Sequence, residues 1–197
     1  MGKRFSERVV LMETGVNIPV VDDEPAMRWL EARWIEDSPI ILSRSRDRFV
    51  EEGYMLLTWN GLGFDFNILA EESGLQTECE RLALAHVDMM FHVVCTKGFP
   101  LALDKVAQGM GLPGKPSGMS GSKAPALWAS GHQSEVLDYV VGDCRTTVAV
   151  AHAAEERGGI EWVTAKGTRA TMPLSSGWLT AEQAMKLTLP DTSWMLS

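Results

Sequence analysis

The chain has 197 residues and a formal net charge of −8 at pH 7, with 45% hydrophobic and 22% charged residues. This composition is that of a globular protein able to bury a sizeable core, and the length favours one domain with an extension over two full domains. The negative charge excludes a protein that coats nucleic acid with a general basic surface. No apolar run approaches the roughly 18 residues that a membrane helix needs, so we expect no membrane-spanning segment.

The cysteine spacing and the N-terminal sequence indicate the cellular compartment. Cys79, Cys95 and Cys144 are widely spaced and form no C-x-x-C pair, which favours reduced thiols over a disulfide framework or a zinc site. Lys3 and Arg4 are not followed by an apolar core, which argues against a signal peptide. We therefore expect a cytoplasmic protein.

The first predicted elements are extended. Apolar runs at 8–12 and 16–21 predict a hairpin or two strand fragments. Acidic residues followed by a proline then predict the start of a helix, and apolar residues at helical spacing extend it over 22–38. A further apolar run predicts a strand over 54–59.

The middle of the chain alternates between helices and strands. The apolar pattern over 64–72 predicts a helix that stops at Gly74. The run 86–94 predicts a second buried strand, and the pattern over 101–110 predicts another helix ending at Gly111.

A long loop and further helices follow. The Gly/Ser/Pro segment 113–123 is long enough to be functional, and helices are predicted over 124–130 and 132–156. Beyond them, the pattern over 160–172 predicts a small hairpin. The T-x-x-Q form of 180–183 predicts a capping box that opens a last short helix.

Strands and helices joined by compact turns predict a layered α/β fold. The character of the chain changes after the two glycines at 158 and 159. We therefore expect a domain over 1–158 and a C-terminal extension over 159–197, made of the hairpin and the short helix.

Two polar motifs carry candidate chemistry. Asn60 and Asp65 form N-x-x-x-F-D at the end of the predicted strand 54–59, while Tyr139 and Asp143 form Y-x-x-x-D on a predicted helix. Residues four apart share one face of a helix. Acidic groups on separate elements and directed at one spot are what a divalent metal site for phosphate chemistry needs, so the motifs predict a nuclease.

With these motifs the chain resembles the DEDD superfamily of 3′–5′ exonucleases, in the branch that has tyrosine in its third motif. The segments 86–90 and 111–123 also resemble predicted bacterial exonucleases related to the proofreading domain of family B polymerases. The resemblance covers about residues 50–155. It implies a ribonuclease H-like three-layer fold with a mixed central sheet, and hydrolysis of phosphodiester bonds at the ends of single-stranded DNA or RNA.

The resemblance also implies roles for single residues. Four carboxylates of this family bind two divalent ions, Mg²⁺ or Mn²⁺. Asp65 matches the second-motif carboxylate, which reaches a metal through water, and Asp143 matches the third-motif ligand. Tyr139 would orient the attacking water, and Asn60 would shape the strand end near the substrate.

Other candidates have a structural interpretation beside the functional one. Trp59 offers a surface for base stacking and Lys123 a contact to the phosphate backbone, whereas core packing and a solvated loop are the alternatives. Asp65 is alternatively a helix N-cap, Tyr139 a half-buried core aromatic, and Asp143 a solvated helix residue.

Asp88 is expected to be a structural or surface acid and not a ligand, and the four histidines, which include His86 and His92, show no metal-ligand spacing. We expect structural or surface positions for them.

The first motif of the family, D-x-E on the first strand, has no clear counterpart, and three alternatives stay open. Glu13 keeps the glutamate of the pattern, with Leu11 where aspartate belongs. Asp22 and Glu24 supply a literal D-x-E. Thirdly, the first strand would lie upstream of Met1. Two carboxylates instead of four would leave a catalytically inactive module for nucleic-acid or protein binding, which is the alternative function.

Overall fold

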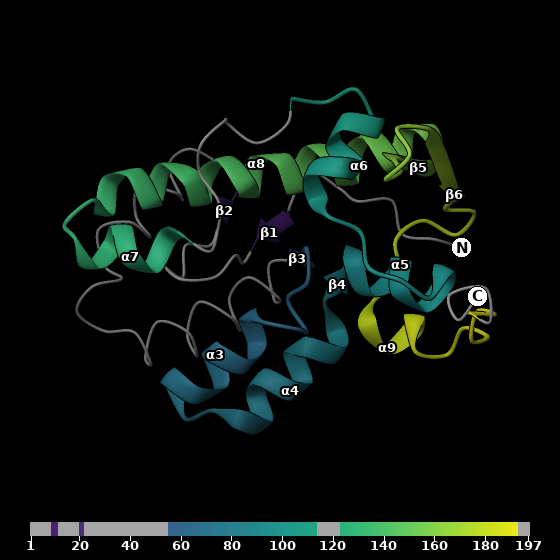
Figure 1. The fold of residues 1–197 in the computed structure, drawn as a ribbon. Coiled ribbons are helices and arrows are strands. Elements are labelled where there is room, and N and C mark those ends of the chain that lie inside the picture. The colour runs from purple at the N-terminus through teal and green to yellow at the C-terminus, as the bar shows by residue number, and fades with distance from the viewer. Residues whose placement is uncertain (1–8, 12–19, 22–54, 114–122, 193–197) are drawn as a thin grey trace.

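The computed structural model describes residues 9–11, 20–21, 55–113 and 123–192. These residues form two sheets with helices packed around them (Figure 1). The mixed α/β character that the sequence predicts is therefore confirmed. The predicted helix over 22–38 lies outside the described residues.

The larger sheet has the strand order β2-β1-β3-β4. Its strands are β1 (Val9–Leu11), β2 (Val20–Val21), β3 (Met55–Thr58) and β4 (Val87–Asp88). β1 pairs antiparallel with β2 and parallel with β3, and β3 pairs parallel with β4. The carboxyl ends of β1, β3 and β4 therefore point to the same edge of the sheet, which is where ligands bind in parallel α/β sheets.

Helices cover both sides of these strands. Figure 1 shows α8 on one side and the pair α3 and α4 on the other. The helices between the two sheets in the sequence are α3 (Asp65–Ser73), α4 (Gln76–Ala85), α5 (Met89–Lys97), α6 (Leu103–Gly109), α7 (Ala124–Ala129) and α8 (Gln133–Arg157). The predicted helices at 64–72, 101–110, 124–130 and 132–156 are confirmed.

The predicted strand over 86–94 is wrong beyond Asp88. β4 ends there, and the Asp88 side chain caps the following helix α5 by accepting from Phe91 N–H at 3.0 Å. Gly98, at φ 83°, closes the same helix. A short apolar run has the same appearance in a buried strand and a buried helix, and here the cap decides between them.

The helix α4 has no counterpart among the predicted elements. Only Cys79 and Ala83 of its ten residues are buried, so its apolar stripe is narrow. These two residues pack with Phe66, Leu69 and Ala70 of α3 in a small second core.

The C-terminal segment forms the predicted hairpin and helix. β5 (Gly159–Val163) pairs antiparallel with β6 (Arg169–Pro173). The helix α9 (Ala181–Ala184) opens with a complete capping box between Thr180 and Gln183. Both predictions are confirmed.

This segment packs on the rest of the molecule. Trp178 Nε1 donates to Ala151 O of α8 at 3.3 Å, and Ala181 N–H donates to His86 O at 2.8 Å. The main core also contains large side chains from this segment: Ile160, Trp162, Met172, Leu174 and Trp178. The boundary at 158 between domain and extension stays a prediction.

The contact between α6 and β5 is close. A Cβ atom at Gly109 would collide with backbone atoms of Glu161 and Trp162. Arg157 Nη1 donates to Met110 O at 2.8 Å and Arg169 Nη1 donates to Gly109 O at 3.0 Å, so two guanidinium groups hold the carboxyl end of α6.

Two sequence-based expectations concern absences. Among the helices of the described ranges, none is long and apolar enough to cross a membrane. All three cysteines lie in the described part of the chain, and none is in a disulfide.

Candidate functional site

A tight turn follows β3 and leads into α3. Asn60 adopts the left-handed conformation at φ 78°, which asparagine tolerates better than most residues. Gly63 N–H donates to Asn60 O at 3.1 Å, and Phe66 N–H donates to Gly61 O at 3.0 Å. The turn therefore passes directly into the first turn of the helix that carries Asp65.

Side chains accept from three successive N–H groups of this turn. Asp88 Oδ1 accepts from Asn60 N–H at 2.9 Å, and Asp88 Oδ2 accepts from Leu62 N–H at 3.0 Å. Between them, Thr58 Oγ1 accepts from Gly61 N–H at 3.1 Å. The conformation around Asn60 is thus fixed by β3 and β4.

Asp65 is the first residue of α3 and is only 5% exposed. The N-cap position is occupied by Phe64, whose side chain has no hydrogen-bond acceptor. The structure therefore contradicts the interpretation of Asp65 as an N-cap. A buried carboxylate is costly unless partners or a cation compensate its charge.

Tyr139 and Asp143 lie one turn apart on α8. Asp143 is also only 5% exposed, so the interpretation as a solvated helix residue is wrong. Tyr139 is half-buried and packs against the main core, which agrees with its structural interpretation and leaves its predicted role untested. The α8 helix therefore carries a buried carboxylate and a phenol on one face, in addition to the buried Asp65 carboxylate of α3.

The two buried carboxylates come from elements on different sides of the sheet. The Oδ1 atoms of Asp65 and Asp143 are buried and accept no hydrogen bond from a described residue, while both residues interact elsewhere. Within the described ranges, no group of three or more His, Cys, Asp or Glu side chains is arranged to hold a metal. Of the predicted ion ligands, the described ranges therefore contain Asp65 and Asp143.

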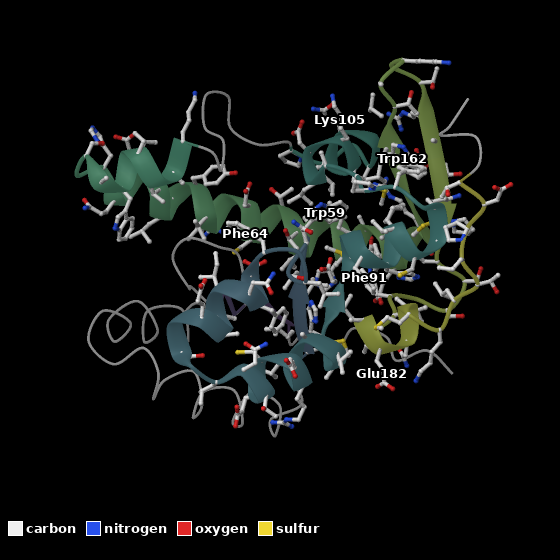
Figure 2. The ribbon with its side chains drawn as sticks, turned by 60° about the horizontal axis from the view of Figure 1, so that its bottom comes forward. Trp59, Phe64, Phe91, Lys105, Trp162 and Glu182 are labelled. Carbon is white, nitrogen blue, oxygen red and sulfur yellow. The ribbon has the colours of Figure 1, made fainter. Side chains whose placement is uncertain are left out.

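The predicted substrate contacts differ in their surroundings. Trp59 packs against the main core and its Nε1 donates to Leu101 O at 3.0 Å, which supports core packing. Lys123 is exposed and lies just before α7. Phe64 belongs to the N-x-x-x-F-D motif, and its side chain is 50% exposed at the N-cap of α3 (Figure 2).

The first-motif candidates Glu13, Asp22 and Glu24 lie outside the described residues. β1 is parallel to β3, with Leu11 opposite Leu57, so it points to the edge where the Asn60 turn begins. β2 is antiparallel to β1 and runs away from that edge.

Comparison with known protein families gives a match over the middle of the chain. The model of a family described as a predicted 3′–5′ exonuclease related to the exonuclease domain of PolB matches residues 71–152, which is 82 residues (152 − 71 + 1) of 197. This range contains Lys123, Tyr139 and Asp143, while Asn60 and Asp65 precede it. No curated protein and no solved structure matches the chain. Residues 71–152 are therefore similar to the PolB-related predicted 3′–5′ exonucleases, and the family resemblance expected from the sequence is confirmed.

Proposed function

We propose that the chain is a metal-dependent 3′–5′ exonuclease that hydrolyses phosphodiester bonds at the ends of single-stranded DNA or RNA. The observation that carries this proposal is the exonuclease family match over 71–152, because that range contains the Y-x-x-x-D motif of Tyr139 and Asp143. The burial of Asp65, the second-motif residue, supports it.

The proposed fold is ribonuclease H-like, with a domain over 1–158 and an extension over 159–197. The mixed sheet β2-β1-β3-β4 supports this fold. The placement of α3 and α4 on one side and α8 on the other supports three layers (Figure 1).

The chemistry of the donor set fits divalent cations. Carboxylate oxygens are the ligands that Mg²⁺ and Mn²⁺ prefer, and the Asp65 and Asp143 carboxylates are both buried. Asp65 and Asp143 would hold the ions. When bound, two such ions activate a water and stabilise the leaving oxygen of a phosphodiester.

The remaining proposed residues would bind the nucleic acid or orient the attacking water. The Tyr139 hydroxyl, one helical turn from Asp143, would direct the attacking water toward the phosphorus atom. Asn60 would contact the terminal nucleotide from the turn after β3. Lys123, which is exposed, would contact the phosphate backbone. Trp59 is the weakest of the proposed contacts, because its ring already packs in the core.

The proposal needs first-motif carboxylates in addition to the two that are described. The direction of β1 favours Glu13, which follows Leu11 by two residues, since β1 points to the same edge as β3. Asp22 and Glu24 follow β2, which runs in the opposite direction.

Incubation of the chain with 5′-labelled single-stranded DNA and RNA in Mn²⁺ tests the proposal. We expect a ladder that shortens from the 3′ end. Asp143→Ala should abolish it, because a proposed ion ligand is lost. Asp138→Ala is the matched control, since Asp138 lies on the same helix but is exposed, and it should leave the ladder unchanged. A wild-type chain that degrades neither substrate would contradict the proposal and favour the inactive binding module.

A further inference from the structure

Asp88 does more than cap a helix. It is 1% exposed, and an N-cap needs only one accepted hydrogen bond. The bond from Phe91 N–H supplies that cap. The two further bonds, from Asn60 N–H and Leu62 N–H, go to the turn after β3. Hydrogen bonds to a carboxylate are among the stronger ones in proteins.

His86 is also 1% exposed and contacts the turn through Thr58. Its Nδ1 lies 2.6 Å from Ala83 O. A carbonyl only accepts, so Nδ1 carries the proton. Burial lowers the pKa of His86, against opposing effects of the Ala83 carbonyl and of Asp88. In the neutral ring, Nε2 therefore accepts from the Thr58 hydroxyl at 3.1 Å.

Thr58 completes the arrangement. Its hydroxyl donates to His86 and its oxygen accepts from Gly61 N–H. A Cβ atom at Gly61 would lie 2.5 Å from Thr58 Oγ1, so the two residues leave no room for a larger side chain. The His86 ring also packs on Phe66, the neighbour of Asp65, with centroids 4.5 Å apart.

We propose that His86 and Asp88 are positioning residues, which act with Thr58 to hold the turn 60–62 and thereby place Asn60 and Asp65. Asp88 holds the N–H groups of residues 60 and 62, and His86 orients the hydroxyl that holds the N–H group of residue 61. The catalytic consequence rests on the proposed exonuclease function. The placement of the turn does not.

Amide hydrogen exchange of single residues tests the placement. Asp88→Ser keeps a good N-cap for α5 but cannot reach both turn amides, so exchange should rise about tenfold at Asn60 and Leu62. Thr58→Val removes the hydroxyl at nearly constant volume, so exchange should rise at Gly61 instead. A general loss of stability would raise all three amides together.

Two further variants separate the roles of the side chains. Thr58→Ser keeps a hydroxyl and should retain the slow exchange of Gly61. His86→Leu should raise the exchange of Gly61 and spare Asn60 and Leu62, which Asp88 holds. The exchange of Val140 in the buried face of α8 reports whether each variant remains folded.

Kinetics test the catalytic consequence. Asp88→Ser and Thr58→Val should lower kcat about 10- to 100-fold with little change in KM, since a misplaced group slows the chemical step. Thr58→Ser should restore kcat. Unchanged exchange at 60–62 in both variants would overturn the proposal. Raised exchange with unchanged kcat would overturn its catalytic consequence. If the wild-type chain degrades no substrate, the exonuclease function fails. The positioning role is then decided by exchange alone: Asp88→Ser should raise it at Asn60 and Leu62, and Thr58→Val should raise it at Gly61.

Discussion

The candidate site and the α6–β5 contact are built in opposite ways. At the site, buried side-chain oxygens accept from the backbone of the Asn60 turn, and the carboxylates of Asp65, Asp88 and Asp143 lie in the interior. At the α6–β5 contact, backbone meets backbone at Gly109, and arginine side chains reach in from the surface. The first region is therefore organised around buried polar side chains, and the second around close packing of backbone against backbone.

The largest expected effect concerns the first-motif carboxylates. Glu13→Gln should lower nuclease activity about 100-fold or more, because it would remove an ion ligand. The double variant Asp22→Asn/Glu24→Gln should retain activity. Initial rates on labelled single-stranded DNA measure both. Loss of activity in the double variant alone would assign the first motif to Asp22 and Glu24.

The next effect concerns the pH dependence of folding stability, to which the buried His92 contributes. His92 is buried, its Nδ1 accepts from Leu179 N–H at 3.4 Å, and burial lowers its pKa to about 4. The unfolded chain therefore binds a proton at this residue first as the pH falls below about 6.5.

This linkage predicts a loss of folding stability toward acid pH. His92 should contribute a decrease of about 2 kcal/mol in the free energy of unfolding between pH 7 and pH 5. His92→Gln should remove this contribution to the decrease in unfolding free energy. His132→Gln, which alters an exposed histidine, should leave the decrease unchanged. Urea unfolding at both pH values provides the measurement. Equal pH dependence in wild type and His92→Gln would contradict the prediction.

The close contact of α6 with β5 gives a stability effect without loss of a site residue. Gly109→Ala should destabilise the fold by about 1–3 kcal/mol, since its Cβ atom meets the backbone of β5. Gly142→Ala is the matched control, because that α8 position has open space. It should stabilise by about 0.5–1 kcal/mol. Equal changes in the free energy of unfolding for Gly109→Ala and Gly142→Ala would show that the α6–β5 distance adjusts freely.

The smallest effect lies at the last helix. Thr180→Ala removes the capping box of α9 and should cost about 1 kcal/mol. Thr188→Ala alters an exposed threonine and should be neutral. Thermal unfolding of the two variants distinguishes them, and identical midpoints would show that α9 does not need its cap.

Local patterns in the sequence were sufficient for several elements. The helices α3, α6 and α8 follow from apolar spacing, and α9 follows from its capping box. The motif residues Asn60, Asp65 and Asp143 also lie in short, readable patterns.

What the sequence could not provide depends on contacts between distant segments. Thr58 pairs with Asp88 across 30 positions (88 − 58), and no local pattern contains that register. The polar contacts that hold the turn were therefore unpredictable. The burial of Asp143 was also unpredictable, because the spacing of α8 does not say which face its neighbours cover.

The bond from Ala181 N–H to His86 O connects α9 to the residue that ends α4 and precedes β4. A nascent chain has made every proposed ion ligand once residue 143 is synthesised, but it cannot complete the surroundings of His86 before residue 181 leaves the ribosome. On the proposed function, the order of translation therefore makes the ion ligands available before α9 can pack against His86.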